Sequence, residues 1–170
     1  VFVYTNYPTA ELFINGKSYG KQSKNNSSLK SRYRLMWMDA VYEPGEVKVV
    51  AYNKDGKAVA EKTVRTAGKP HHIELVSNRN ELTADGKDLA YVTVKVVDKD
   101  GNLCPTDSRL IHFSVKGAGK FRAVANGDPT NLEQFHLPKM HAFHGMLTAI
   151  VQAGEIAGDL VLTAKASGVK

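Results

Sequence analysis

The stretch LAYVTVKVVDKDGN (Leu89–Asn102) carries the clearest structural signal in the chain. Its apolar residues at 90, 92, 94 and 96 recur every second position, which is the period of a β-strand with one face buried. An Asp-Gly pair follows, and this pair is favoured in tight hairpin turns. The stretch therefore predicts a strand that turns back on itself within an antiparallel sheet.

The same two-residue period recurs on both sides of this stretch, and helical periodicity is nearly absent. Clusters of Gly, Asp, Asn and Pro separate the alternating runs. Many short strands without intervening helices predict an all-β fold, with two consecutive immunoglobulin-like antiparallel β-sandwich domains. The other expected strands are residues 1–5, 10–14, 33–37, 46–52, 58–64, 72–77, 110–117, 120–125, 146–153 and 159–166.

The boundary between the two domains is expected at TAGKPHH (residues 66–72), where Gly68 and Pro70 cannot continue a ladder smoothly. This places a small β-sandwich domain at 1–67 and an immunoglobulin-like domain at 70–170. The second part has about 100 residues, the size of one such sandwich. The first is small for an independent core, so we expect it to lean on neighbouring domains.

The composition indicates a soluble globular chain, with 42% hydrophobic and 24% charged residues. No apolar run approaches the roughly 20 residues of a membrane span, so none is expected. The single cysteine, Cys104, excludes an internal disulfide and a cysteine-based zinc site. The chain begins with valine inside a strand-like pattern, which favours a fragment of a longer protein.

The net charge of +6 is unevenly distributed. An anionic partner, such as nucleic acid or a sulfated glycan, would explain a local excess of cations. The alternative is a solvated loop, which the composition of residues 21–31 favours. Only Tyr19 and Tyr33 flank the cations, so we expect no nucleic-acid partner. Six cations occur without an acid between Glu11 and Asp39: Lys17, Lys21, Lys24, Lys30, Arg32 and Arg34.

Three histidines, His136, His141 and His144, follow the polar run NGDPTNLEQF (residues 126–135), where Asp128 and Glu133 could add oxygen ligands. Their spacing fits no recognised metal motif, and neither a helix nor a strand would place all three on one face. A polar loop is the favoured interpretation, and we expect no metal and no cofactor.

Glycosidase chemistry needs two carboxylates about 5 Å apart on a rigid scaffold. The candidate acids lie beside Pro-Gly or Asp-Pro turns or within the polar run, so each has an explanation in turn chemistry. These acids are Glu43, Glu46, Asp128 and Glu133. The sequence therefore contains no convincing catalytic constellation.

Aromatic residues concentrate in the first domain, which raises the hypothesis of sugar stacking, with Trp37 and Tyr42 as candidate residues. The alternative is that Trp37, which lies within an expected strand, is the core tryptophan of a small sandwich. We favour the core interpretation for Trp37.

Two ordered sets of motifs resemble the C-terminal end of glycoside hydrolase family two enzymes of the β-galactosidase type. VYTN, AELFINGKSYG, VYEPGEVKVVAYNKDGK and TAGKP are similar to the small sandwich domain that follows the catalytic barrel. IELVSNRNELTADGKDLAYVTVKVVDKDGNLCP, IHFSVKGAGKFRAVANGDPTNLEQF and AFHGMLTAIVQ are similar to the immunoglobulin-like C-terminal domain. Where family members often have Ala-Phe-Asn-Gly, this chain has His144 in the Asn place.

The resemblance implies a non-catalytic accessory role, beside the catalytic barrel and other domains of the same polypeptide. The parent would hydrolyse terminal β-galactosides or related glycosides by a retaining mechanism with two barrel glutamates. No glutamate here matches those motifs, so no catalytic residue is carried over. The resemblance also implies a parent of the Bacteroides kind that is periplasmic, extracellular or on the cell surface.

Two other functions remain as alternatives, a carbohydrate-binding module and an adhesin-like interaction domain. For the polar run 126–135 we hypothesise that Asn126, Asp128 and Glu133 contact a neighbouring domain or edge the substrate cleft, because exposed loops at sandwich ends often carry function.

Overall fold

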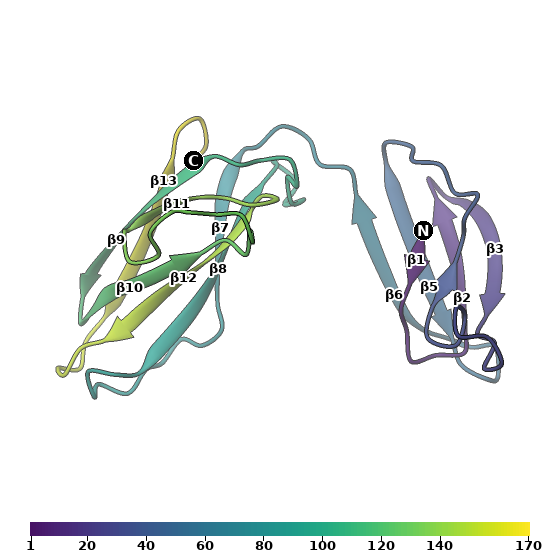
Figure 1. The fold of residues 1–170 in the computed structure, drawn as a ribbon, viewed down its shortest axis with the longest axis horizontal. Coiled ribbons are helices and arrows are strands. Elements are labelled where there is room, and N and C mark those ends of the chain that lie inside the picture. Colours follow the sequence, from purple (N-terminus) through teal and green to yellow (C-terminus); the bar gives the residue numbers. More distant parts are fainter. The chain divides into compact units, whose positions relative to one another are not determined.

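A computed structural model describes residues 1–170, and every regular element in it is a β-strand. Thirteen strands form four sheets, and all strand pairs are antiparallel. The expected all-β fold of antiparallel sandwiches is confirmed. The chain divides into two compact units, Val1–Thr66 (unit 1) and Ala67–Lys170 (unit 2), each visible in Figure 1. The structure contains no helix with the length and apolarity that crossing a membrane requires.

Unit 1 contains a four-stranded sheet in the order β3-β2-β5-β6 and a two-stranded sheet, β1-β4. The residues that alternate inward on the central strand β2 form the core together with residues of the small sheet. The strands are β1 (Phe2–Val3), β2 (Thr9–Ile14), β3 (Lys17–Ser23), β4 (Leu35–Met36), β5 (Glu46–Tyr52) and β6 (Ala58–Arg65).

Local chemistry sets the turn between β2 and β3. Asn15 and Gly16 have φ angles of 49° and 80°, and Ile14 pairs with Lys17 across the turn. Two consecutive positive φ angles define the type I′ turn, for which Asn-Gly is the preferred pair because its twist matches that of the strands. The Asn15 side chain also accepts a hydrogen bond from the backbone N–H of Glu46 at 2.8 Å, which ties this turn to β5.

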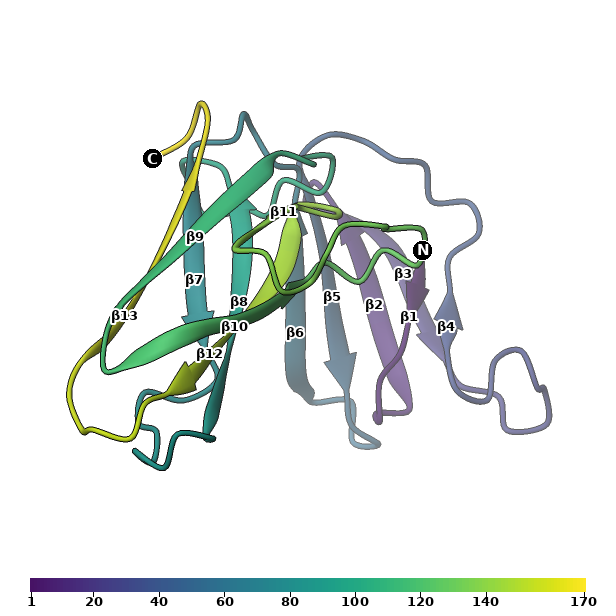
Figure 2. The ribbon, with the colours of Figure 1, turned by 60° about the vertical axis from the view of Figure 1, so that its left-hand side comes forward.

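Unit 2 is a sandwich of a four-stranded sheet, β10-β12-β8-β7, and a three-stranded sheet, β11-β9-β13. Figure 2 shows β9 crossing in front of β7 and β8, as expected for two packed layers. Sheets of four and three strands are the arrangement of a constant-type immunoglobulin domain. The strands are β7 (His72–Ser77), β8 (Leu89–Val97), β9 (Leu110–Gly117), β10 (Gly119–Ala125), β11 (Lys139–His141), β12 (Met146–Ala153) and β13 (Leu160–Ala166).

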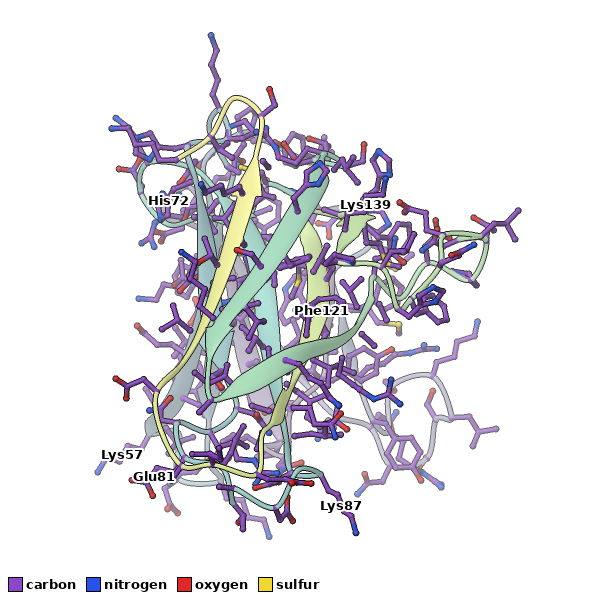
Figure 3. All side chains as sticks on the ribbon, turned by 90° about the vertical axis from the view of Figure 1, so that its left-hand side faces the viewer. Lys57, His72, Glu81, Lys87, Phe121 and Lys139 are labelled. Atoms are coloured by element: carbon purple, nitrogen blue, oxygen red, sulfur yellow. The ribbon has the colours of Figure 1, made fainter.

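The core of unit 2 follows directly from the alternation in β8 and β12. Val94 and Leu147 face inward from these strands and meet Ile111 and Phe113 of the opposite sheet. Phe121, labelled in Figure 3, stacks on Phe113 with ring centroids 5.9 Å apart. These inward side chains bury apolar area from both layers, which is the main stabilising term of a sandwich.

The turn that follows β8 is held by one buried carboxylate. Asp98 Oδ1 accepts hydrogen bonds from the backbone N–H groups of Asp100 and Asn102 at 2.9 and 2.8 Å. Its Oδ2 accepts one from the backbone N–H of Gly68 at 2.7 Å. These bonds lower the pKa of Asp98 far below its ordinary value, with that from Gly68 contributing most. Asp98 therefore joins the turn DKDGN to the segment that precedes β7.

Two strands, β3 and β11, were not predicted from the sequence. β3 contains mostly polar residues, and its side chains are mainly exposed, so it lacks the apolar alternation of a half-buried strand. It is an edge strand, where lysines are common because they discourage pairing with other chains. Residues 21–23, expected in a loop, belong to it. β11 has three residues and forms only through its pairing with β9.

Candidate functional site

The polar run that begins at Asn126 forms the connection from β10 in one sheet to β11 in the other. Figure 3 shows this connection, which ends at the labelled Lys139, extending away from the two sheets. The backbone N–H of Val124 donates to the carbonyl of Phe135 at 2.8 Å, and that of Phe113 donates to the carbonyl of Pro138 at 2.8 Å. We call residues 126–138 the sheet-crossing loop.

Asn126 is the centre of the hydrogen bonds in the sheet-crossing loop. Its Nδ2 donates to the carbonyl of His141 at 3.0 Å. Its Oδ1 accepts from the backbone N–H of Asp128 at 3.1 Å and from Nδ2 of Asn131 at 3.3 Å. Asn126 thus connects the beginning of the loop with β11, and its polar groups are engaged within the chain.

The two acids of the loop are engaged in the same way. Asp128 Oδ1 accepts from the backbone N–H and the hydroxyl of Thr130 at 2.8 and 2.7 Å, and these bonds lower the pKa of Asp128. Glu133 Oε2 accepts from the backbone N–H of His141 at 3.1 Å, and its Oε1 lies 3.1 Å from Nδ1 of the same histidine. Asn126, Asp128 and Glu133 therefore shape the loop.

The apolar side chains of the loop face solvent. Leu132 is 95% exposed and Phe135 is 55% exposed, although both are large hydrophobic residues. The sequence carries no signal for these two residues, because no periodic pattern marks an apolar residue within a polar run. The polar side chains form hydrogen bonds within the chain, whereas Leu132 and Phe135 are exposed to solvent.

The three histidines do not converge. His141 lies against Glu133, and His144 Nδ1 donates to the carbonyl of Pro105 at 3.2 Å. His136 is exposed on the loop. No group of three or more His, Cys, Asp or Glu side chains has the geometry to hold a metal ion.

His144 occupies a backbone position that favours asparagine. His144 and Gly145 have φ angles of 51° and 75°, and Phe143 and Met146 exchange backbone hydrogen bonds at 2.9 and 3.0 Å across them. This is again the geometry of a type I′ turn, in which Asn precedes Gly most often. A Cβ atom on Gly145 would lie 2.3 Å from the carbonyl oxygen of Cys104, so only glycine fits the second position. Turn geometry therefore explains why this place suits Asn-Gly.

The other two acids considered for catalysis are at the end of unit 1 that contains the Asn15 turn. Glu46 forms a salt bridge with Arg65 at 2.6 Å, and Glu43 lies 3.5 Å from Nδ2 of Asn15. Both carboxylates thus have partners from turn or edge residues.

The two residues considered for sugar stacking have opposite environments. Trp37 is 1% exposed in the core of unit 1, and its indole N–H donates to the carbonyl of Gly20 at 3.1 Å. A ring this deeply buried has no face on which a sugar could stack, so the structure removes Trp37 as a stacking candidate. Tyr42 is 72% exposed, and its hydroxyl lies 3.2 Å from that of Thr66.

Comparison with known proteins finds a matching family for each of the two parts of the chain. Residues 73–170 match the family described as glycoside hydrolase family 2 C-terminal domain 5. Residues 1–60 match a family described as a domain of unknown function.

Individual proteins resemble the chain over nearly all of its length. A β-galactosidase of Bacteroides ovatus is 43% identical over 167 residues, which are 98% of this chain and 19% of that protein. A β-galactosidase of Thermoanaerobacter pseudethanolicus is 30% identical over 97% of this chain and 22% of that protein. A solved glycosyl hydrolase family 2 member from Bacteroides cellulosilyticus is 34% identical with a TM-score of 0.86, over 99% of this chain and 23% of that chain. The chain thus spans about a fifth of the curated relatives it matches.

Proposed function

The chain belongs to the glycoside hydrolase family 2 C-terminal domain family, and we propose that it serves as a non-catalytic accessory part of a longer glycosidase. The match at 43% identity over 98% of the chain to a fifth of a β-galactosidase carries this proposal. The parent protein would hydrolyse terminal β-galactosides or related glycosides with two glutamates of a barrel domain. A (β/α)8 barrel takes about 250 residues and eight helices, whereas this chain of 170 residues consists of strands.

The enzymatic part of the proposal is tested by comparing the chain with its parent. Purified residues 1–170 and the full-length protein would be assayed with a chromogenic β-galactoside under the same conditions. Hydrolysis by the full-length protein alone is expected. Hydrolysis by residues 1–170 would contradict the non-catalytic role, and a full-length protein that cleaves no β-glycoside would contradict the assignment of the parent.

We propose that the sheet-crossing loop contacts another domain of the same polypeptide. The relatives are domains within larger family 2 proteins, so such a domain is available as a partner. Leu132 and Phe135 would supply the buried area, and Asn126, Asp128 and Glu133 would hold the loop in the shape that presents them. Burial of a leucine side chain as exposed as Leu132 contributes about 2 kcal/mol, which is substantial for one contact between domains.

The contact is tested with Leu132→Ser combined with Phe135→Ser in the full-length protein. We expect a lower midpoint of thermal inactivation, while residues 1–170 carrying the same changes unfold as the unchanged chain does. Ile156→Ser is the matched control, because Ile156 is an exposed apolar residue in a different loop of unit 2. Equal behaviour of the double variant and the control in the full-length protein would contradict the contact.

Two further parts of the proposal concern domain organisation and location. Each compact unit would be a domain, with boundaries near 1–67 and 70–170, and separate unfolding of the two sets of backbone amide signals would support this. The parent would be exported to the periplasm or the cell surface, where its glycan substrate is found. Fractionation of cells of the source bacterium, followed by detection of the parent, tests this location.

A further inference from the structure

A cationic cleft lies on unit 1, outside the sheet-crossing loop. It has a volume of about 580 Å³ and is lined by Lys24, Arg32, Lys54, Tyr33, Asn6, Asn26 and Pro8. Three of these side chains are cations and none is an acid. Lys24, Arg32 and Lys54 form no salt bridge with any carboxylate of the chain. The cleft is therefore a local concentration of positive charge without an internal counterion, which favours an anionic ligand.

The loop that carries Lys24 and Arg32 is organised by its own hydrogen bonds, whereas Lys54 lies in the turn between β5 and β6. The backbone N–H of Ser28 donates to the carbonyl of Asn25 at 3.2 Å, and that of Arg32 donates to the carbonyl of Ser28 at 2.9 Å. The Lys24 ammonium donates to the carbonyl of Thr5. These bonds hold Lys24 and Arg32 in place within a loop in which Arg32 remains exposed.

Arg32 is oriented in a way that leaves one edge of its guanidinium available. Its Nε and Nη2 both donate to the carbonyl of Asn26, at 3.0 and 2.9 Å. This uses the side edge of the planar group, so the N–H bonds at the Nη1–Nη2 edge remain for a ligand. Two parallel N–H groups on one edge match the two oxygens of a carboxylate or a sulfate. Because Asn26 already fixes the guanidinium, little additional ordering accompanies such binding.

The remaining lining groups suit a sugar ring. Tyr33 is 66% exposed, so much of its ring is accessible beside Arg32, whose Cζ lies 5.8 Å from the ring centroid. The Asn6 and Asn26 side chains make no hydrogen bond within the chain and are exposed. An aromatic surface with neighbouring amides and cations combines apolar contact with hydrogen bonding, as ligand sites commonly do.

We propose that this cleft binds an acidic sugar residue, in which a pyranose ring carries a carboxylate or a sulfate group. The anion would lie on the open edge of Arg32 with Lys24 and Lys54 nearby, and the ring would contact Tyr33. The choice of a glycan as ligand rests on the proposed function. In the parent enzyme the cleft would hold an acidic part of the glycan away from the catalytic barrel.

The proposal is tested by NMR titration of residues 1–170 with four probes. An oligogalacturonide supplies carboxylates, a sulfated galactan oligosaccharide supplies sulfates, a neutral galacto-oligosaccharide has no charge, and a deoxythymidine decamer represents nucleic acid. We expect one or both acidic oligosaccharides to shift the backbone amide signals of Asn26, Arg32 and Tyr33, with weaker binding at higher salt. The acidic oligosaccharide that shifts these amide signals shows whether the cleft binds a carboxylate or a sulfate.

Substitutions distinguish specific binding in the cleft from general attraction to the net positive charge of the chain. Arg32→Gln should weaken the binding of the acidic oligosaccharide at least tenfold. Arg32→Lys should weaken it as well, because lysine lacks the two parallel N–H groups of the guanidinium. Tyr33→Ala should weaken it more than Tyr33→Phe. Arg122→Gln is the matched control, because Arg122 is an exposed cation of unit 2 and its removal changes the net charge equally.

Four results would overturn the proposal: no site-specific shift at millimolar oligosaccharide, equal binding of the neutral probe, tighter binding of the decamer, or equal loss in the Arg122 variant. The backbone amide spectra of the variants establish that they remain folded. Each of these results leaves the accessory role intact, since that role is tested by the activity of the full-length protein.

Discussion

The cationic cleft of unit 1 and the sheet-crossing loop of unit 2 are both built from polar runs, yet their hydrogen bonds differ. In the sheet-crossing loop the side chains of Asn126, Asp128 and Glu133 bond to neighbouring groups, and apolar side chains face solvent. In the cleft, backbone carbonyls hold Lys24 and Arg32, and several N–H donors of these two side chains have no partner. The composition of a polar loop therefore does not indicate which of its groups are available to a ligand. A count of the hydrogen-bond donors and acceptors that lack a partner within the chain identifies the groups available to a ligand.

The turn at Asp98 extends this comparison, because both oxygens of its buried carboxylate are occupied. Asp98→Asn replaces one carboxylate oxygen with an NH2 group, which donates. A backbone N–H of Gly68 or of the turn would then face another donor and lose its hydrogen bond. We expect the midpoint of thermal unfolding at pH 7, followed through the amide signals of unit 2, to fall by roughly 10 °C.

The same carboxylate predicts a dependence on pH. The folded-state pKa of Asp98 is lowered, so its contribution to stability is complete above the ordinary pKa of an aspartate and decreases as the pH falls below about 4. The difference between the unchanged chain and Asp98→Asn should therefore become smaller at pH 3 than at pH 7. A difference that stays constant over this range would show that the charge of Asp98 does not stabilise unit 2.

A matched pair of asparagines tests the comparison directly. Asn126→Ala removes three side-chain hydrogen bonds and should lower the unfolding midpoint of unit 2 by roughly 5 °C. Asn26→Ala removes a side chain without such bonds and should change the midpoint of unit 1 by less than about 2 °C. Thermal unfolding followed by circular dichroism and by amide signals checks both values. Equal effects of the two changes would contradict the distinction between the loops.

His144→Asn should stabilise unit 2. The positive φ of His144 is an uncommon conformation for most residues but a frequent one for asparagine in a type I′ turn. We expect the unfolding midpoint to rise by roughly 3 °C, measured by calorimetry. The hydrogen bond from His144 to Pro105 opposes this gain. A decrease in the midpoint would mean that this bond outweighs the backbone preference.

Leu132→Ser should have the smallest effect on the isolated chain. Because Leu132 is almost fully exposed, its replacement should change the unfolding midpoint by less than about 2 °C. Denaturant unfolding of residues 1–170 provides the measurement. A clear destabilisation would show that Leu132 packs within the chain, and the loop would then lose its main apolar contact residue.

The strands with regular apolar alternation could be predicted, whereas two edge strands, β3 and β11, and the conformations of the loops could not. The strand at 89–98 and the one at 146–153 alternate so regularly that their faces follow from the sequence. β3 and β11 carry no such pattern, since edge strands need not bury a face. The candidate contact residues were chosen for polarity, and the structure shows that these side chains bond inside the loop.

The sequence by itself determined the all-β class, the positions of most strands, the Asp-Gly turn at 100–101 and the resemblance to a family. These features depend on local properties, namely the period of apolar residues and the φ angles that turn residues prefer. The tertiary structure alone decided that Leu132 and Phe135 are exposed, and that Lys24, Arg32 and Lys54 meet in one cleft. These features depend on contacts between residues far apart in the chain, and no local pattern encodes which hydrogen bonds those contacts complete.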